Sequence, residues 1–243
     1  MSVHAPVVPI NLATQQAGSG APPAKAYQLV SRQVHVEDTV VSVGEARFGG
    51  GHFAVIAGPC AVESRNQVLE TAHAVREAGA AMLRGGAYKP RTSPYDFQGL
   101  GEEALALLAL AREETGLPIV TEVMDSEDVA IVARYADMLQ IGARSMSSFR
   151  LLQKVAATGK PVLLKRGYQA SIREWLLSAE NLLAAGNSQV VLCERGLRTP
   201  DSEFTRNTLD LTAIALAHLE THLPVIADPS HGTGRADLVA TMS

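Results

Sequence analysis

One unit repeats seven times along most of this chain: a short run of valine, isoleucine and leucine, a polar or glycine-containing loop, and a helical stretch. A short apolar run without polar alternation is typical of a strand that is buried on both faces. The predicted strands are residues 53–60, 81–89, 118–125, 138–143, 161–167, 190–195 and 224–229.

Helical stretches separate these strands, and they are predicted at residues 66–78, 101–115, 126–133, 149–158, 172–185 and 205–219. Buried strands that alternate with amphipathic helices predict an α/β fold with a parallel sheet and helices outside it. Seven such units fit a (β/α)8 TIM barrel better than the alternative, an open sheet. We expect the barrel to be incomplete at its C-terminus, because an eighth strand is missing and residues 235–243 begin the seventh helix.

The segments before the barrel differ in composition. Residues 1–25 are rich in alanine, proline, glycine, glutamine and serine without an apolar period, which predicts a flexible leader. Residues 27–45 contain alternating apolar and polar positions, which predict a strand or short hairpin. A chain of 243 residues suffices for one large core. We therefore expect one domain, a C-terminally truncated barrel of the (β/α)8 type over residues 26–243.

Composition excludes several classes of partner. The formal net charge of -4 provides no general basic field, so nucleic acid is not an expected partner. Two distant cysteines are typical of a reduced protein rather than a disulfide scaffold. No apolar run is long enough to span a membrane, and the first residues do not form a signal peptide. These features predict a cytoplasmic protein.

Polar residues gather where the predicted strands end, and in a barrel these ends form the rim that carries the active site. The rim residues are Cys60, Arg84, Lys89, Glu122, Asp125, Arg144, Lys165, Arg166, Glu194, Arg195, Asp228 and His231. Many cationic groups on one rim, in a chain of net negative charge, predict a ligand with phosphate and carboxylate groups.

Two rim residues suggest further chemistry. Cys60, in G-P-C, and His231, in S-H-G-T-G, offer thiolate and imidazole ligands for a shared metal ion, although two ligands make an incomplete site. Taken alone, Cys60 is more typical of a small buried hydrophobe. Lys165 is a candidate for Schiff-base chemistry, and binding of a carboxylate explains it equally well.

Seven segments carry a resemblance to a known family. They are I-A-G-P-C-A-V-E-S (56–64), R-G-G-A-Y-K-P-R-T-S-P-Y-D-F-Q-G-L-G (84–101), Q-I-G-A-R (140–144), P-V-L-L-K-R-G (161–167), L-C-E-R-G-L-R-T (192–199), T-R-N-T-L-D-L (205–211) and D-P-S-H-G-T-G-R (228–235). From about residue 27 onwards, the chain closely resembles 3-deoxy-D-arabino-heptulosonate 7-phosphate (DAHP) synthases of the short microbial type, type I beta.

The resemblance implies a transferase with a TIM barrel that condenses phosphoenolpyruvate with D-erythrose 4-phosphate to DAHP and phosphate. This reaction is the first step of the shikimate pathway, which leads to chorismate and the aromatic amino acids. The resemblance also implies a divalent metal (Mn, Fe, Co or Zn). The expected assembly is a homo-oligomer or an association with a paralogue.

Roles for single residues also follow from the resemblance. Phosphoenolpyruvate would be held by Arg84, Lys89, Arg144, Lys165 and Arg195, with the two lysines nearest its carboxylate and Arg144 and Arg195 on its phosphate. The erythrose phosphate would be held by Arg91, Thr92 and Ser93. The metal ligands would be Cys60 and His231, and the catalytic set would be Lys89, Lys165, Cys60 and His231.

Two departures from the family leave other functions open. Two further metal ligands of the family, a glutamate and an aspartate, have no counterpart before Ser243, and the frequent N-terminal regulatory domain has none in residues 1–25. The alternative is a catalytically impaired fragment or paralogue that binds phosphoenolpyruvate or a full-length partner. A Schiff-base aldolase acting through Lys165 is the third hypothesis, and it leaves Cys60 and His231 unused.

Overall fold

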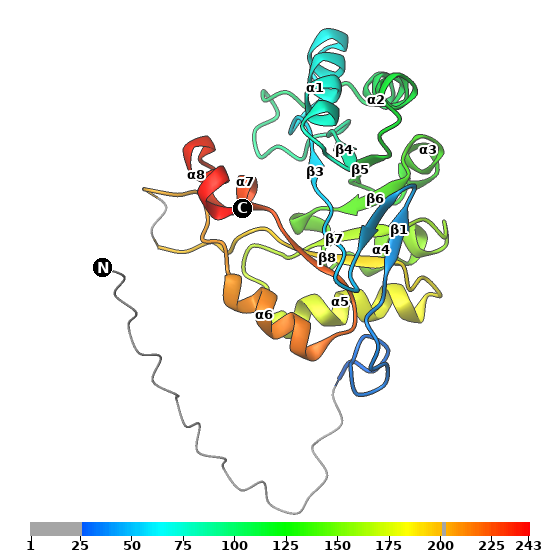
Figure 1. Cartoon of the computed structure of the whole chain (residues 1–243), viewed down its shortest axis with the longest axis vertical. Helices are drawn as coiled ribbons and strands as arrows, with labels where there is room; N and C mark the ends of the chain where they lie inside the picture. The colour runs from blue at the N-terminus through cyan, green and yellow to red at the C-terminus, as the bar shows by residue number, and fades with distance from the viewer. Residues whose placement is uncertain (1–25, 201–202) are drawn as a thin grey trace, which may run out of the picture.

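A sheet of seven parallel strands forms the centre of the protein (Figure 1). The computed structural model describes residues 26–200 and 203–243, so the predicted leader (1–25) lies outside the described residues. The strands follow one another in sequence order: β3 (Ile56–Ala57), β4 (Met82–Arg84), β5 (Ile119–Val123), β6 (Met138–Ile141), β7 (Val162–Lys165), β8 (Val190–Glu194) and β9 (Val225–Ala227). All seven lie within the predicted ranges, which confirms the incomplete barrel.

All six predicted helices are present, and helices cover the outer side of the sheet (Figure 1). They are α1 (Arg65–Glu77), α2 (Glu102–Thr115), α3 (Val129–Tyr135), α4 (Phe149–Ala156), α5 (Ile172–Ala184) and α6 (Leu211–Glu220). Two short helices, α7 (Pro229–Thr233) and α8 (Ala236–Met242), follow β9. Local signals fix the helix starts; in α5, for example, the side chain of Ser171 and that of Glu174 cap each other's backbone N–H groups.

Helix α6 differs most from its predicted start. Helix α6 was expected from residue 205, but it starts at Leu211, because Asp210 is its N-cap and accepts a hydrogen bond from the Ala213 amide at 3.0 Å. Before it, Thr208 forms an isolated bridge with Leu197. The polar run 205–210 therefore belongs to a loop beside the C-terminal end of β8.

The outer face of the sheet forms the main core with the helices. The strand residues in this core include Leu83, Ile119, Leu139, Leu164 and Leu192. Trp175 of α5 is fully buried there, and its indole N–H donates to the carbonyl of Leu164 at 3.1 Å. Each strand thus presents alternate residues to the helices, as its period of two requires.

The inner face holds a second apolar cluster. It contains Met82, Val120, Met138, Leu163, Val191 and Cys193, together with Val41, Val43, Ala46 and Phe48 of an antiparallel hairpin. The hairpin consists of β1 (Val41–Val43) and β2 (Ala46–Phe48), and its apolar residues alternate with exposed ones. The predicted hairpin is confirmed, with its second strand beyond the expected range of 27–45.

The hairpin lies at the N-terminal ends of the strands. Its turn residue Gly44 has φ of 57°, and a Cβ there would lie 2.9 Å from the side chain of Pro118, which directly precedes β5. A Cβ on Gly49, just after β2, would similarly lie 3.1 Å from Pro224, which directly precedes β9. The apolar face of the hairpin therefore covers this end of the barrel and leaves the C-terminal ends of the strands open.

Inward-facing residues change character along each strand. Met82, Val120, Met138 and Leu163 belong to the inner cluster, and two positions further on stand Arg84, Glu122, Gln140 and Lys165. Residues two apart in a strand point to the same side of the sheet. The interior therefore has an apolar floor with a layer of charged and polar side chains above it.

The outermost strands of the sheet, β3 and β9, do not pair with each other in the described part of the chain. A cavity of about 500 Å³ lies there, lined by residues of both strands and by Phe53, Ser230 and Val239.

None of the helices within residues 26–200 and 203–243 is long and apolar enough to cross a membrane.

We predict that Phe48→Ala destabilises the protein, because Phe48 is only 2% exposed within the inner cluster. Removing a buried phenylalanine costs about 3–5 kcal/mol of the free energy of unfolding, which urea denaturation would measure. The control is Phe53→Ala, since Phe53 is 89% exposed and its loss should change stability by less than about 0.5 kcal/mol. Equal effects of the two substitutions would contradict the role assigned to the hairpin.

Candidate functional site

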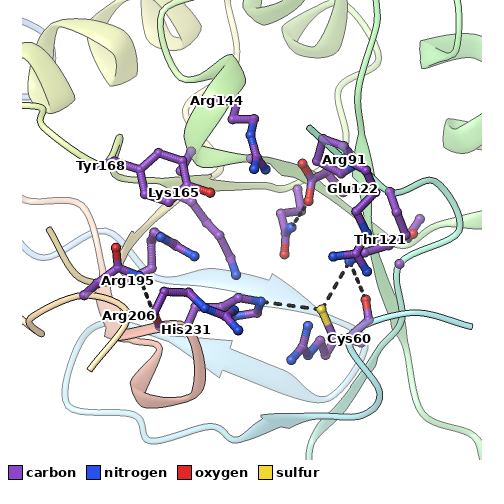
Figure 2. A pocket seen from close by; sticks show the side chains of 18 of the residues that line it. Cys60, Arg91, Thr121, Glu122, Arg144, Lys165, Tyr168, Arg195, Arg206 and His231 are labelled. Carbon is purple, nitrogen blue, oxygen red and sulfur yellow. Dashed lines mark hydrogen bonds between the residues drawn. The ribbon is translucent and has the colours of Figure 1, made fainter. Parts of the chain in front are cut away.

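A cavity of about 330 Å³ opens at the C-terminal end of the sheet (Figure 2). Its acidic lining residues are Asp96 and Glu122, and its lysines and arginines are Arg84, Lys89, Arg91, Arg144, Lys165, Arg195, Arg198 and Arg206. Eight cationic side chains against two carboxylates create a positive potential that attracts a ligand with several negative charges. Guanidinium groups bind phosphate and carboxylate oxygens in pairs.

The structure brings together nine of the ten predicted site residues. The residues that line this cavity are Cys60, Arg84, Lys89, Arg91, Thr92, Arg144, Lys165, Arg195 and His231. The tenth, Ser93, lies in the same loop but does not line the cavity, and its hydroxyl accepts a hydrogen bond from the Tyr95 amide at 3.2 Å. The binding roles of all ten residues stay predictions.

Arg166 and Glu194, both expected on the rim, do not reach the cavity. They face the helices, where Arg166 Nη1 lies 2.8 Å from Glu194 Oε2 and 3.0 Å from Asp210 Oδ2. Each is next in sequence to an inward-facing residue, and neighbouring residues of a strand point to opposite sides of the sheet. Asp125 is also absent from the cavity lining and instead accepts a hydrogen bond from the Glu127 amide.

Cys60 lies at one side of the cavity between two nitrogen donors (Figure 2). Its sulfur is 3.7 Å from His231 Nε2 and 3.2 Å from Lys89 Nζ, which also donates to the Cys60 carbonyl at 2.7 Å. The hydrogen bond from His231 lowers the pKa of Cys60 to about 5, with help from Lys89 and Arg84 and against the effect of burial. The thiolate is therefore the dominant form at neutral pH.

The Cys60–His231 pair fits a shared metal ion. Metal–sulfur and metal–nitrogen bonds of about 2.3 and 2.0 Å at a tetrahedral angle place the two donor atoms about 3.5 Å apart. The observed separation is 3.7 Å. In the ranges that the structure describes, no group of three or more histidine, cysteine, aspartate or glutamate residues is placed to hold a metal ion. The described residues therefore supply two ligands of such a site.

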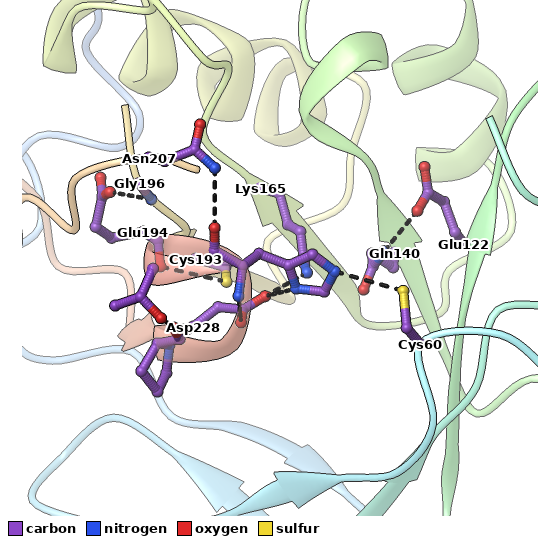
Figure 3. Close-up of polar contacts among 12 residues, drawn as sticks. Cys60, Glu122, Gln140, Lys165, Cys193, Glu194, Gly196, Asn207 and Asp228 are labelled. Carbon is purple, nitrogen blue, oxygen red and sulfur yellow. Dashed lines mark hydrogen bonds and ion pairs between the residues drawn. The ribbon is translucent and has the colours of Figure 1, made fainter. Parts of the chain in front are cut away.

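Asp228 follows β9 and contacts both His231 and Lys165 (Figure 3). Its Oδ2 atom lies 2.7 Å from His231 Nδ1 and 2.6 Å from Lys165 Nζ. Burial opposes ionisation of this carboxyl, but the hydrogen bond from His231 and the charge of Lys165 outweigh it and hold its pKa well below the usual range. Asp228 is therefore a carboxylate that contacts two residues of the cationic cavity, while it lines the neighbouring cavity between β3 and β9 itself.

Tyr168, which was not predicted as a site residue, organises three of the arginines. The guanidinium carbons of Arg195, Arg198 and Arg144 lie 4.5, 5.5 and 5.6 Å from the centre of its ring. Such cation–π contacts hold planar guanidinium groups in place without neutralising them. No sequence signal marks this tyrosine, because it lies in a loop after β7 and has no periodic neighbours.

Arg195 is the most buried of these three arginines. Only 5% of it is exposed, and its Nη1 atom is buried without a hydrogen-bond partner among the described residues. A buried N–H group without a partner is rare and costs stability, and a ligand oxygen would satisfy it. Arg195 is therefore the clearest indication that the cavity is built for an anion.

Other lining residues were also missed by the sequence analysis. Gln140 donates to Glu122 Oε2 at 2.9 Å, and Asn207 donates to the carbonyl of His231 at 2.9 Å. Gln140 could have been found by counting two positions along β6 from the apolar Met138. Gly142 leaves room for Glu122, since a Cβ there would lie 2.0 Å from the glutamate Oε1.

We predict that iodoacetamide alkylates Cys60 in the metal-free protein with a pH midpoint near 5, because its pKa is lowered to about 5. His231→Ala removes the largest cause of this shift and should move the midpoint upward. Mass spectrometry of the modified peptide at several pH values measures both rates. Cys193 is the internal control, since burial raises its pKa to about 12 and it should stay unmodified. A wild-type midpoint near 8.5, the value of a free cysteine, would contradict the prediction.

We also predict that Arg166→Met destabilises the protein, because it leaves the buried carboxylate of Glu194 without its ion-pair partner. Breaking a buried pair from one side typically costs about 3–5 kcal/mol, measurable by urea denaturation. Arg198→Met, at an exposed arginine, is the control and should cost less than about 1 kcal/mol. Comparable losses would mean that the Arg166–Glu194 pair is not important for stability.

Comparisons with known proteins identify the family of this chain. A model of the DAHP synthetase I family matches residues 32–243. The phospho-2-dehydro-3-deoxyheptonate aldolase of Thermotoga maritima is 53% identical over 219 residues, which cover 90% of this chain and 64% of that enzyme. A 2-dehydro-3-deoxyphosphooctonate aldolase of Acidithiobacillus ferrooxidans is 37% identical over 188 residues, which cover 74% of this chain and 65% of that protein. The chain thus spans less than two thirds of the length of these two relatives.

Solved structures give the same result. A crystal structure of the Thermotoga maritima phospho-2-dehydro-3-deoxyheptonate aldolase (DAHP synthase) matches with a TM-score of 0.87 and 52% identity, covering 90% of this chain and 64% of that one. A truncated form of the synthase from the same organism matches with a TM-score of 0.82 and 50% identity, covering 88% of this chain and 78% of that one. With the family model matching most of its length, this chain belongs to the DAHP synthetase I family.

Proposed function

We propose that this chain carries the substrate-binding cavity of a DAHP synthase, which condenses phosphoenolpyruvate with D-erythrose 4-phosphate and releases phosphate. The reaction opens the shikimate pathway towards chorismate and the aromatic amino acids. The observation that carries the proposal is the cavity lined by eight cationic side chains, with the Cys60–His231 pair beside them. Membership of the family and the 53% identical Thermotoga enzyme support it.

Phosphoenolpyruvate is the ligand for the deeper part of the cavity. The residues assigned to it are Arg84, Lys89, Arg144, Lys165 and Arg195. Its phosphate is assigned to Arg144 and Arg195, which both contact the ring of Tyr168. Arg195 also has the buried Nη1 without a partner among the described residues. Its carboxylate is assigned to Lys89 and Lys165, two largely buried ammonium groups. Charge-assisted hydrogen bonds of this kind are about twice as strong as neutral ones.

Erythrose 4-phosphate is the ligand for the outer part. Arg91 is exposed and Thr92 lies beside it in the lining, so their loop suits a phosphate that enters after the deeper ligand. Ser93 belongs to the same loop and adds a hydroxyl close by. Holding one phosphate in the deeper part of the cavity and the other in the outer part would bring the two reacting carbons together between the phosphates. This lowers the entropic cost of the reaction.

The Cys60 thiolate and His231 Nε2 are the residues that would hold a divalent metal such as Mn, Fe, Co or Zn. When bound, such an ion polarises a carbonyl oxygen, here that of the erythrose 4-phosphate aldehyde. In the reaction, C3 of phosphoenolpyruvate forms a bond to the aldehyde carbon, water adds at C2, and phosphate leaves with cleavage of its bond to C2. The protein's own contribution is to hold the anions and to exclude competing orientations.

A second function has a specific observation in its favour. The cationic cavity by itself suffices to bind phosphoenolpyruvate, so a relative that binds this anion without turning it over is the second candidate. The Schiff-base alternative has less support, because the Lys165 amine is engaged by Asp228 at 2.6 Å rather than free to attack a carbonyl.

Cytoplasmic location and association with another chain are part of the proposal. Two cysteines without a disulfide suit the reducing cytoplasm. A homo-oligomer, or an association with a paralogue, is proposed from the family resemblance.

The test is an assay of the purified protein with both substrates and Mn²⁺, using the periodate–thiobarbiturate reaction to detect DAHP. We predict product formation, and Arg195→Ala should lower kcat/KM for phosphoenolpyruvate by about 10- to 150-fold, the loss of one charged hydrogen bond. Arg47→Ala, at an exposed position on the hairpin, is the control and should be neutral. Absence of product, with phosphoenolpyruvate binding retained in calorimetry, would reject the catalytic function and favour the non-catalytic one.

A further inference from the structure

Asp228 is the one side chain in the described site that contacts both the candidate metal ligand His231 and the candidate anion ligand Lys165. We propose that Asp228 is a positioning residue that couples the two halves of the site, orienting a metal-binding imidazole and an anion-binding ammonium with one carboxylate. The inference rests on the proposed function, which assigns His231 to a divalent cation and Lys165 to the carboxylate of a three-carbon phosphorylated acid.

Three hydrogen bonds converge on this carboxylate (Figure 3). Oδ1 accepts from the backbone amide of His231 at 3.0 Å, and Oδ2 accepts from His231 Nδ1 at 2.7 Å and from Lys165 Nζ at 2.6 Å. The side chain of Asp228 is only 15% exposed. Three hydrogen bonds hold this partly buried carboxylate in one orientation. The carboxylate in turn holds the His231 ring and the Lys165 ammonium group in place.

The local sequence explains why these groups meet. Asp228 stands two positions after Ile226, which packs against the inner cluster, so its side chain points inward. Pro229 then begins α7, and the short helix turns the chain back so that His231 lies over the same carboxylate. Lys165 arrives from β7 with the same inward orientation as Leu163.

The contact with His231 determines which nitrogen faces the cation site. Because Nδ1 donates to Oδ2, Nε2 is directed at the Cys60 sulfur, 3.7 Å away. A carboxylate on the outer nitrogen of a metal-binding histidine fixes the ring orientation and raises its basicity, and its loss typically weakens metal binding by about 10–100-fold.

The contact with Lys165 determines where the ammonium group lies. The lysine side chain is 8% exposed, and its Nζ is held 2.6 Å from Oδ2 while Lys165 lines the cavity. A held ammonium loses less conformational entropy when an anion binds than a free one does. Both contacts use the same oxygen atom, so removal of the carboxylate must affect the cation and the anion sites together.

Asp228→Asn tests this inference with little risk to the fold. Asparagine is as good an N-cap as aspartate, so it can keep the hydrogen bond to the His231 amide and preserve the start of α7. It then presents its NH₂ group, which cannot accept a hydrogen bond, to His231 Nδ1 and Lys165 Nζ. The matched control is Asp237→Asn on α8, which removes the same charge from an exposed ion pair with Arg235.

Two titrations give readouts that a purely structural role would not move. Co²⁺ is followed by its thiolate charge-transfer absorption, and phosphoenolpyruvate is followed by calorimetry without metal, with circular dichroism as a check on folding. We expect Asp228→Asn to weaken Co²⁺ binding about 10–100-fold and phosphoenolpyruvate binding about 10-fold, and Asp237→Asn to change neither. A folded Asp228→Asn protein that loses only one of the two affinities, or neither, would overturn the coupling.

A further measurement separates failure of this inference from failure of the proposed function. If wild-type protein shows no cobalt–thiolate absorption, the metal role of Cys60 and His231 is wrong. Nitrogen-15 NMR of the His231 ring then tests Asp228 directly, without metal or activity. A proton on Nδ1 in the wild type that changes its chemical shift strongly in Asp228→Asn supports the positioning role, and an unchanged ring spectrum overturns it.

Discussion

The alternation of side chains along parallel strands is the constraint on which the site depends. Two steps along a strand separate an apolar floor residue such as Leu163 from a functional one such as Lys165, and one further step reaches Arg166 on the opposite face. The same rule brings Arg84 and Glu122 into the cavity from neighbouring strands. Because backbone hydrogen bonds fix the strands, the charged groups are held together before any ligand arrives.

Gathering so many cations has an electrostatic cost, and the structure limits it in three ways. The Cys60 thiolate lies against Lys89, and the Asp228 carboxylate lies against Lys165. Tyr168 spaces the arginines with the face of a neutral ring. Each device leaves part of the cationic group available, since only one side of it is engaged. Arg195 shows the result, with a buried nitrogen that has no partner in the described residues.

Much of this arrangement could be predicted from sequence because it depends on local patterns. Apolar runs located all seven strands, and of the ten site residues predicted from strand ends and family motifs, nine line the cavity. Arg166 was wrongly expected on the rim, because the prediction took every polar residue at a strand end and did not consider that neighbouring residues point to opposite sides of the sheet. The late start of α6 at Asp210 and the arginine contacts of Tyr168 depend on tertiary packing, which no local pattern encodes.

The open side of the sheet has a consequence for the solvent around the site. The cavity between β3 and β9 and the cationic cavity share Arg84, Gln140 and Lys165 in their linings. Groups seated in the cavity between β3 and β9 would therefore lie directly behind the charges of the cationic cavity. Any chain that covers the gap would dehydrate these groups and strengthen their attraction for anions several-fold, since Coulomb energies scale inversely with that constant. The affinity of the cationic cavity for anions therefore depends on what occupies the cavity between β3 and β9.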